Sequence, residues 1–218
     1  MDFQKARFNM VEQQIRPWDV LDFDVLDALD AIPREEFVTE EQKPYAYADV
    51  CLPLPNGGKM LEPRIVARLI QGLALKKTDN VLEIGTGSGY ATALLATLAG
   101  QVVSIDMDAA QQTLAKAALD KVGLANIIYQ NGDGLAGQVG GAPFDAIYVG
   151  GSVPDVPEVL KSQLKDGGRL VIITGGSPVQ HALQITRNGD EYTSVTLFDT
   201  SVADLQAPTV AKPSKFHF

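Results

Sequence analysis

Apolar residues recur along the chain with two periods, and these periods predict alternating helices and strands. Near the N-terminus the spacing is helical and predicts helices over residues 2–15 and about 22–32. Beyond residue 63, short β-branched runs alternate with further helical patterns. The predicted strands lie at 80–84, 101–105, 126–129, 144–149 and 169–174, and the predicted helices at 64–75, 88–99, 109–122 and 154–164. Such alternation is typical of a parallel sheet in an α/β protein.

The alternation stops after residue 174. Residues 181–187 and 191–198 are separated by Asn188, Gly189 and Asp190, which predicts a β-hairpin. Five strands followed by a hairpin give a mixed sheet of seven strands. Residues 200–218 fit neither a helix nor a strand and are expected to form an irregular tail.

Residues 43–63 differ from their surroundings, because they hold six prolines and glycines with two tyrosines between them. A loop of this length within a compact domain is typically functional. We therefore expect one domain in three segments. These are N-terminal helices and a substrate loop (1–62), an α/β core (63–199) and the tail (200–218).

Composition narrows the function. The 218 residues carry a net charge of −9, which argues against long nucleic acid as a partner. No apolar run is long enough to span a membrane and the N-terminus lacks the core of a signal peptide, so we expect a cytoplasmic protein with no membrane partner. Cys51 is the sole cysteine, so it forms no internal disulfide, and we expect it to be buried. We expect no metal site.

Three alternating glycines follow the first predicted core strand, at Gly85, Gly87 and Gly89. Glycines let a backbone approach a ligand closely, and the helix that begins here offers unpaired N–H groups. A dinucleotide-binding turn would have glycine or alanine where this chain has Tyr90. The turn therefore favours another polar, nucleotide-like ligand.

Five short motifs carry a resemblance to a known family. They lie at residues 10–15 (MVEQQI), 33–38 (PREEFV), 80–90 (NVLEIGTGSGY), 132–134 (GDG) and 164–172 (LKDGGRLVI). In this order they resemble the protein-L-isoaspartate O-methyltransferase family over roughly residues 8–185. The resemblance implies a Rossmann-like sheet, S-adenosyl-L-methionine (SAM) as cofactor, S-adenosyl-L-homocysteine as its product, and no metal.

The candidate cofactor residues lie at the ends of the predicted strands. Asp106 ends the second core strand, where a carboxylate can accept hydrogen bonds from ribose hydroxyls; its alternative role, capping the next helix, is open to Asp108. The resemblance places Asp133 near the adenine; the alternative is that Asp133 only shapes the turn. Glu83 is expected near the amino group of SAM; the alternative is that it forms only a structural pairing. The expected cofactor-binding residues are Glu83, Gly85, Thr86, Gly87, Ser88, Gly89, Asp106, Met107, Asp133, Gly134 and Leu135.

The substrate loop departs from the family, and so does the tail. Where the family has a serine beside the transferred methyl group, this chain has Leu61, which cannot donate a hydrogen bond to a carboxylate. The catalytic residue is thus unassigned. We expect Lys59, Leu61 and Arg64 to contact the acceptor, with Lys59 as its clamp; the alternative for Lys59 and Arg64 is two solvated loop charges.

Three functions follow. The first is methylation of an isoaspartyl carboxylate in damaged proteins; a carboxylate is already ionised at neutral pH, so no general base is needed, and the sequence shows no Ser/His/Asp or Cys/His set. The second is methylation of another acceptor, either a small molecule or another macromolecular group. The third is a SAM-binding module without catalysis.

Overall fold

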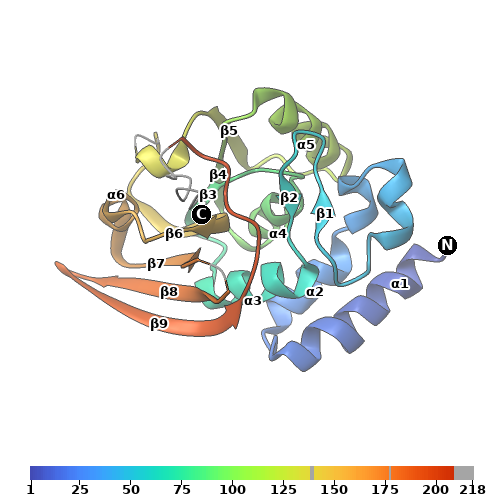
Figure 1. Ribbon diagram of the computed structural model, residues 1–218, viewed down its shortest axis with the longest axis horizontal. Coiled ribbons are helices and arrows are strands. Elements are labelled where there is room, and N and C mark those ends of the chain that lie inside the picture. The colour runs from blue at the N-terminus through green and yellow to red at the C-terminus, as the bar shows by residue number, and fades with distance from the viewer. Residues whose placement is uncertain (138–139, 177, 209–218) are drawn as a thin grey trace, which may run out of the picture.

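A computed structural model of the chain describes residues 1–137, 140–176 and 178–208, and it is built around one seven-stranded sheet (Figure 1). The strands run in the order β5-β4-β3-β6-β7-β8-β9, in which β8 and β9 are antiparallel to their neighbours and the others are parallel. Their bounds are Asn80–Ile84 (β3), Gln101–Asp106 (β4), Ile127–Asn131 (β5), Phe144–Val153 (β6), Leu164–Thr174 (β7), Gln180–Asn188 (β8) and Glu191–Thr200 (β9). The predicted α/β class, mixed sheet and terminal hairpin are confirmed.

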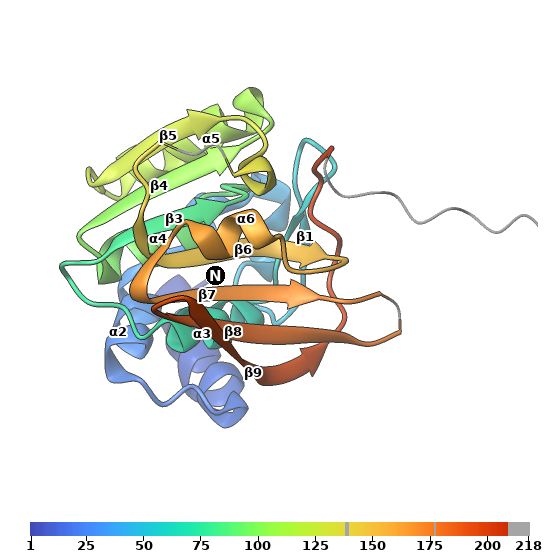
Figure 2. The ribbon, with the colours of Figure 1, turned by 90° about the vertical axis from the view of Figure 1, so that its left-hand side faces the viewer.

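Both faces of the sheet are covered, which explains the continuous apolar runs of its central strands. Val81 and Val102 belong to one apolar core, which they share with the main helices, whereas Leu82 and Val103 belong to a second core beneath the short helix α6. Figure 2 shows the sheet from the side of α6, with α2 and α3 behind it. The longer helices are Phe3–Asn9 (α1), Phe23–Ala31 (α2), Pro63–Leu73 (α3), Tyr90–Leu98 (α4) and Ala109–Lys121 (α5), and α6 spans Glu158–Ser162.

The observed bounds of the elements differ from the predicted bounds at several places, and a cap fixes the start of α2. Asp22 caps α2 by accepting from the backbone N–H groups of Asp24 and Val25. The first predicted helix continues from α1 into a π-helical stretch, Met10–Ile15. The strands β6 and β7 are longer than predicted, and α6 is shorter, because pairing resumes beyond their glycines, at Ser152 and Val153 in β6 and at Leu164 in β7, across two register shifts.

The predicted loop over residues 43–63 contains regular structure. Two 3₁₀-helices, Arg34–Phe37 (η3) and Glu40–Tyr45 (η4), precede a small hairpin formed by Leu52–Pro53 (β1) and Lys59–Met60 (β2). Cys51 is exposed where the chain enters this hairpin, so the prediction of a buried cysteine is wrong. The sequence does not predict the hairpin, because strands of two paired residues are too short to show an alternating pattern and the prolines and glycines around them are typical of a loop.

Beyond β9 the chain crosses the carboxyl ends of the parallel strands. Residues 201–207, which we call the strap, run beside the β1–β2 hairpin in both ribbon views (Figures 1 and 2). The backbone of the strap is bonded to β6, because Ser152 N–H donates to the carbonyl of Ala203 and Leu205 N–H donates to the carbonyl of Ser152. The part of the predicted tail beyond residue 208 lies outside the described residues. The three-segment division of the domain stays a prediction.

Candidate active site

A pocket opens at the carboxyl ends of β3, β4 and β6, between the glycine turn, the β1–β2 hairpin and the strap. The sheet order reverses between β3 and β6, and ligands of open α/β sheets bind at such a reversal. Gly85 has a φ of +89°, a conformation that favours glycine. A side chain at Gly150 would lie 3.0 Å from the Gly85 carbonyl oxygen, so the floor of the pocket depends on glycine in both strands.

Asp106 lies on the pocket wall at the end of β4. Its Oδ2 accepts from the N–H of Gly87 at 3.0 Å, and its Oδ1 accepts from the N–H of Asp108 at 2.9 Å. Asp108, as predicted, caps α5 with its own carboxylate. Asp106 is therefore oriented by the glycine turn, and each oxygen keeps acceptor capacity for a ligand hydroxyl. Its predicted contact with ribose is consistent with this position and stays a prediction.

Glu83 lies beneath the pocket and does not line it. Its Oε2 accepts from the hydroxyls of Thr92 and Ser104, both at 2.6 Å, and its Oε1 has no hydrogen-bond partner among the described residues. Complete burial raises the pKa of Glu83 to about 8, so the carboxyl is mostly protonated at pH 7. A contact with the amino group of SAM stays a prediction, and as an ion pair it would require Glu83 to lose this proton.

A buried chain of hydrogen bonds joins Glu83 to helix α5. The Ser104 hydroxyl donates to Glu83, so its oxygen accepts from the Thr86 hydroxyl at 2.7 Å, and Thr86 in turn accepts from Gln112 Nε2 at 3.0 Å. Gln112 also donates to the carbonyls of Ser104 and Gln130. This one side chain therefore connects the glycine turn with the ends of β4 and β5, a role that the sequence did not indicate.

The remaining predicted cofactor residues divide between the pocket surface and its support. Those that line the pocket are Gly85, Thr86, Gly87, Ser88, Asp106, Met107, Asp133 and Gly134. Gly89 and Leu135 do not. A side chain at Gly89 would lie 3.2 Å from the methyl group of Ala115, so this glycine permits α4 to approach α5. Leu135 is buried in the second core, and its N–H donates to Asp133 at 3.0 Å.

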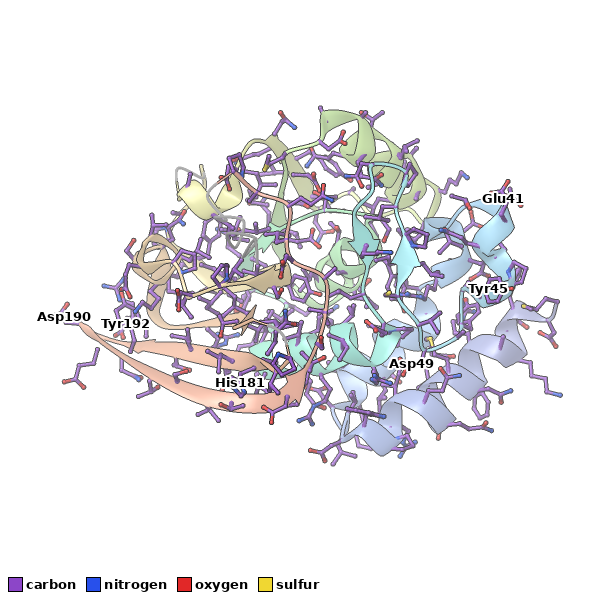
Figure 3. All side chains as sticks on the ribbon, viewed as in Figure 1. Glu41, Tyr45, Asp49, His181, Asp190 and Tyr192 are labelled. Carbon is purple, nitrogen blue, oxygen red and sulfur yellow. The ribbon has the colours of Figure 1, made fainter. Side chains whose placement is uncertain are left out.

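The hairpin brings two of the three predicted acceptor residues to the pocket. Lys59 and Leu61 line it; Lys59 is exposed, whereas Leu61 is buried. Arg64 does not line the pocket, because its guanidinium pairs with Asp49 and stacks on Trp18 at 4.3 Å. Figure 3 labels Asp49, which lies just before the hairpin. The charge of Arg64 therefore already has a carboxylate partner, and the role of Lys59 as the acceptor clamp stays a prediction.

The strap supplies residues that sequence reasoning missed. Residues 203–207 line the pocket, and Leu205 Cδ1 would lie 3.0 Å from a side chain placed at Gly85. Ser152 holds the strap, because its hydroxyl donates to Asp204 Oδ1 at 2.8 Å and accepts from Gln180 Nε2 at 2.9 Å. Gln180 also accepts from the N–H of Val202. An irregular tail has no periodicity, so no sequence pattern could place it here.

The fold and the pocket define a SAM-dependent methyltransferase: a doubly covered sheet with a glycine turn after β3 and an acid at the end of the adjacent strand. Residues 6–202 match the family described as protein-L-isoaspartate(D-aspartate) O-methyltransferase (PCMT). The chain belongs to this family, which confirms the resemblance read from its motifs. A protein-L-isoaspartate O-methyltransferase of Syntrophus aciditrophicus is 45% identical over 189 residues, 87% of either chain. One of a Roseiflexus species is 38% identical over 205 residues, 94% of either chain.

Solved structures agree with this assignment. A protein-L-isoaspartate O-methyltransferase structure superposes with a TM-score of 0.79 at 27% identity and covers 94% of this chain and 66% of that one. A Plasmodium falciparum structure, described as a putative enzyme of the same name in complex with S-adenosyl-L-homocysteine, superposes with a TM-score of 0.77 over 94% of this chain and 99% of that one. At 20% identity the second likeness concerns the fold alone.

The described residues contain neither a membrane-spanning helix nor a cluster of metal ligands. None of the helices there combines the length and apolarity needed to cross a bilayer. In the same residues, no group of three or more His, Cys, Asp or Glu side chains is arranged to hold a metal ion. The cytoplasmic location stays a prediction from the sequence.

Proposed function

We propose that this protein transfers the methyl group of SAM to the carboxylate of isoaspartyl residues in altered proteins or peptides. The observation that carries the proposal is the position of Lys59 on the lining of the pocket that also contains the glycine turn. Lys59 lines the pocket, and it forms no ion pair or side-chain hydrogen bond within the part of the chain that the structure describes. A cation that lines the same pocket as the cofactor wall, which we define as the glycine turn and the ends of β3, β4 and β6, is suited to an anionic acceptor.

The residues present fit SAM as the donor. The glycine turn lets the ligand approach the backbone, Asp106 offers acceptors for ribose hydroxyls, and Asp133 with Gly134 borders the place proposed for adenine. A side chain at Gly134 would lie 2.6 Å from Ile105, so only glycine fits at this position of the pocket wall. When bound, SAM supplies a methyl group on a positively charged sulfur.

The acceptor wall, which we define as the β1–β2 hairpin with Leu61 and the strap, would promote methyl transfer by positioning the acceptor and excluding water. A carboxylate acceptor needs no proton removed before it attacks, so rate depends on holding it close and in line. Lys59 would hold the acceptor charge, while the buried side chains of Met60 and Leu61 and the strap residue Leu205 exclude water around it. Leu61 thus makes the acceptor site drier than the family's serine would, and the exposed Lys59 would attract the acceptor carboxylate from the rim of the pocket.

One transfer assay tests the proposal. The purified protein is incubated with SAM carrying a labelled methyl group and either an isoaspartyl peptide or its aspartyl twin. We expect label on the isoaspartyl peptide alone. If neither peptide is labelled while calorimetry shows intact SAM binding, the isoaspartyl acceptor is wrong, and an acceptor of different charge is implied.

A Leu61→Ser variant separates the acceptor class from the details of the loop. If Lys59 compensates for the family's serine, this variant should retain isoaspartyl activity. If the wild-type chain is inactive and Leu61→Ser gains activity, the divergence in acceptor lies at this position.

A further inference from the structure

Arg34 is a buried charge that the proposed chemistry does not yet use. It begins η3, and its side chain is completely buried. Nη2 donates to the carbonyl oxygen of Leu61 at 3.1 Å, and the guanidinium carbon lies 4.7 Å from the centre of the Tyr90 ring. Phe37, from the same 3₁₀-helix, meets the edge of that ring at a centroid distance of 5.7 Å.

This arrangement is costly for a merely structural arginine. Burial lowers the pKa of the Arg34 guanidinium, and no carboxylate lies within 4.0 Å of it among the described residues. Nε and Nη1 make no hydrogen bond of standard geometry there either, although the nearby Tyr90 hydroxyl favours the charged guanidinium and offsets part of the cost of burial. An apolar side chain of similar length would fill the space without the cost of desolvating a charge. A feature that lowers stability in this way is expected where it serves the active site.

The hairpin is joined to the rest of the protein at both of its ends. Gln42 Nε2 donates to the Pro53 carbonyl, on β1, at 2.7 Å. Arg34 donates to the Leu61 carbonyl, directly after β2. Lys59 lies between these two anchors, opposite Pro53 in the hairpin ladder. The Arg34 bond therefore sets how far Lys59 and Leu61 stand from the cofactor wall.

Tyr90 completes the connection. It is the first residue of α4, directly after the glycine turn, and it lines the pocket with Leu61. The guanidinium group of Arg34 therefore lies between the two walls, because it bonds the Leu61 carbonyl of the acceptor wall and stacks on the Tyr90 ring next to the glycine turn. A displacement of about 1 Å between reacting groups costs on the order of 10²-fold in rate.

We propose that Arg34 is a positioning residue for methyl transfer, which fixes the acceptor wall relative to the glycine turn by bonding the Leu61 carbonyl and stacking on Tyr90. The inference rests on the proposed function for its activity readout. Arg34 does not line the pocket, so its effect on the acceptor acts through Leu61 and Lys59.

The test compares two substitutions with a matched control. Arg34→Met keeps most of the side-chain length and removes the charge and its donors, and Arg34→Lys keeps the charge and a single donor nitrogen. Arg187→Met is the control, because Arg187 likewise donates to a backbone carbonyl, that of Leu164, on β8 away from the pocket. We expect Arg34→Met to lower kcat/KM for the isoaspartyl peptide about 10- to 100-fold, with SAM affinity changed less than about threefold. Arg34→Lys should recover part of this loss, and Arg187→Met should show none.

A second readout does not depend on the acceptor. Trypsin cleaves after lysine, and Lys59 is exposed in the hairpin. We expect Arg34→Met to speed cleavage between Lys59 and Met60 by about tenfold, because the loss of one anchor lets the hairpin open more often. The cleavage is followed by the mass of fragment 1–59, at a temperature where melting curves show the variants to be folded.

Two results would overturn the role of Arg34. One is unchanged cleavage after Lys59 together with wild-type kinetics in Arg34→Met. The other is an equal loss of activity in Arg34→Met and Arg187→Met that follows the folded fraction. If Arg34→Met does not fold, Arg34→Lys carries both measurements. If the wild-type protein labels no isoaspartyl peptide, the proposed acceptor fails, and the cleavage rates alone decide on Arg34.

Discussion

The cofactor wall and the acceptor wall of the pocket are built in different ways. The cofactor wall is made of strand ends and the glycine turn, and its polar groups are bonded to neighbours in the sheet, as Asp106 is to Gly87. The acceptor wall consists of a short hairpin and an irregular strap, fastened by a few side chains such as Arg34 and Ser152. Since the second wall is fastened largely by side chains from distant elements and not by the ladder of the parallel strands, we expect its sequence to diverge more readily than that of the cofactor site.

The difference matches where this chain departs from the family pattern. The glycine turn and the strand-end acids fit the pattern, whereas Leu61 and the strap do not. Four measurements test whether the two walls are as separate as the structure indicates.

The largest effect is expected from the buried carboxyl beneath the cofactor wall. The pKa of Glu83 is raised to about 8 from an ordinary value of 4.5, so the folded protein holds the proton more tightly than the unfolded chain. Stability from this group is therefore full below pH 4.5 and is lost as pH rises to 8, by up to about 5 kcal/mol. Glu83→Gln, which mimics the protonated form, should remove this dependence in urea unfolding at a series of pH values. An unchanged slope would show that Glu83 is charged in the folded protein.

Asp106→Ala comes next, and it tests the cofactor wall directly. Loss of two ribose hydrogen bonds should weaken SAM binding about tenfold to several hundredfold, as measured by calorimetry. Asp108→Ala is the matched control, because Asp108 caps α5 from outside the pocket lining. That variant should lose helix stability and keep its affinity. Equal affinity in wild type and Asp106→Ala would contradict the ribose assignment.

Ser152→Ala tests how the strap is held. It removes the bond to Asp204 and leaves the buried Gln180 amide without its acceptor. The strap should open more often, and S-adenosyl-L-homocysteine should dissociate about 5- to 30-fold faster in stopped-flow experiments. Ser162→Ala, which removes a hydroxyl bonded within α6, is the control. Identical dissociation rates in all three proteins would mean that the strap is held by its backbone and Leu205 alone.

Lys59→Met should give the smallest effect of the four substitutions. Because Lys59 is exposed, solvent screens its charge, and the KM for the isoaspartyl peptide should rise only about 2- to 5-fold. SAM affinity should not change. Lys116→Met, on the outer face of α5, controls for the loss of one surface charge. A drop in SAM affinity with Lys59→Met would show that the two walls are coupled through the bound ligands.

The cofactor wall could be predicted from sequence because its determinants are local. The order of strand, glycine turn and helix is contiguous over residues 80–98, and Asp106 follows its own strand. The acceptor wall depends on contacts between distant residues, such as Arg34 with Leu61 and Ser152 with Asp204. These contacts follow no sequence periodicity, so the sequence predicts a loop where the hairpin lies and does not predict the position of the strap. Glu83 was assigned to a strand end correctly, but its depth below the pocket depends on packing.

The strap also bears on how the protein matures as it is made. Its residues are synthesised after every strand of the sheet, and Ala203 and Leu205 pair with Ser152, some fifty positions earlier in the chain. During translation the sheet can form first from the N-terminal side, while the pocket stays open along one edge. Enclosure of the ligand therefore follows formation of the sheet, and a chain interrupted before residue 203 would carry the cofactor wall without the strap that covers it.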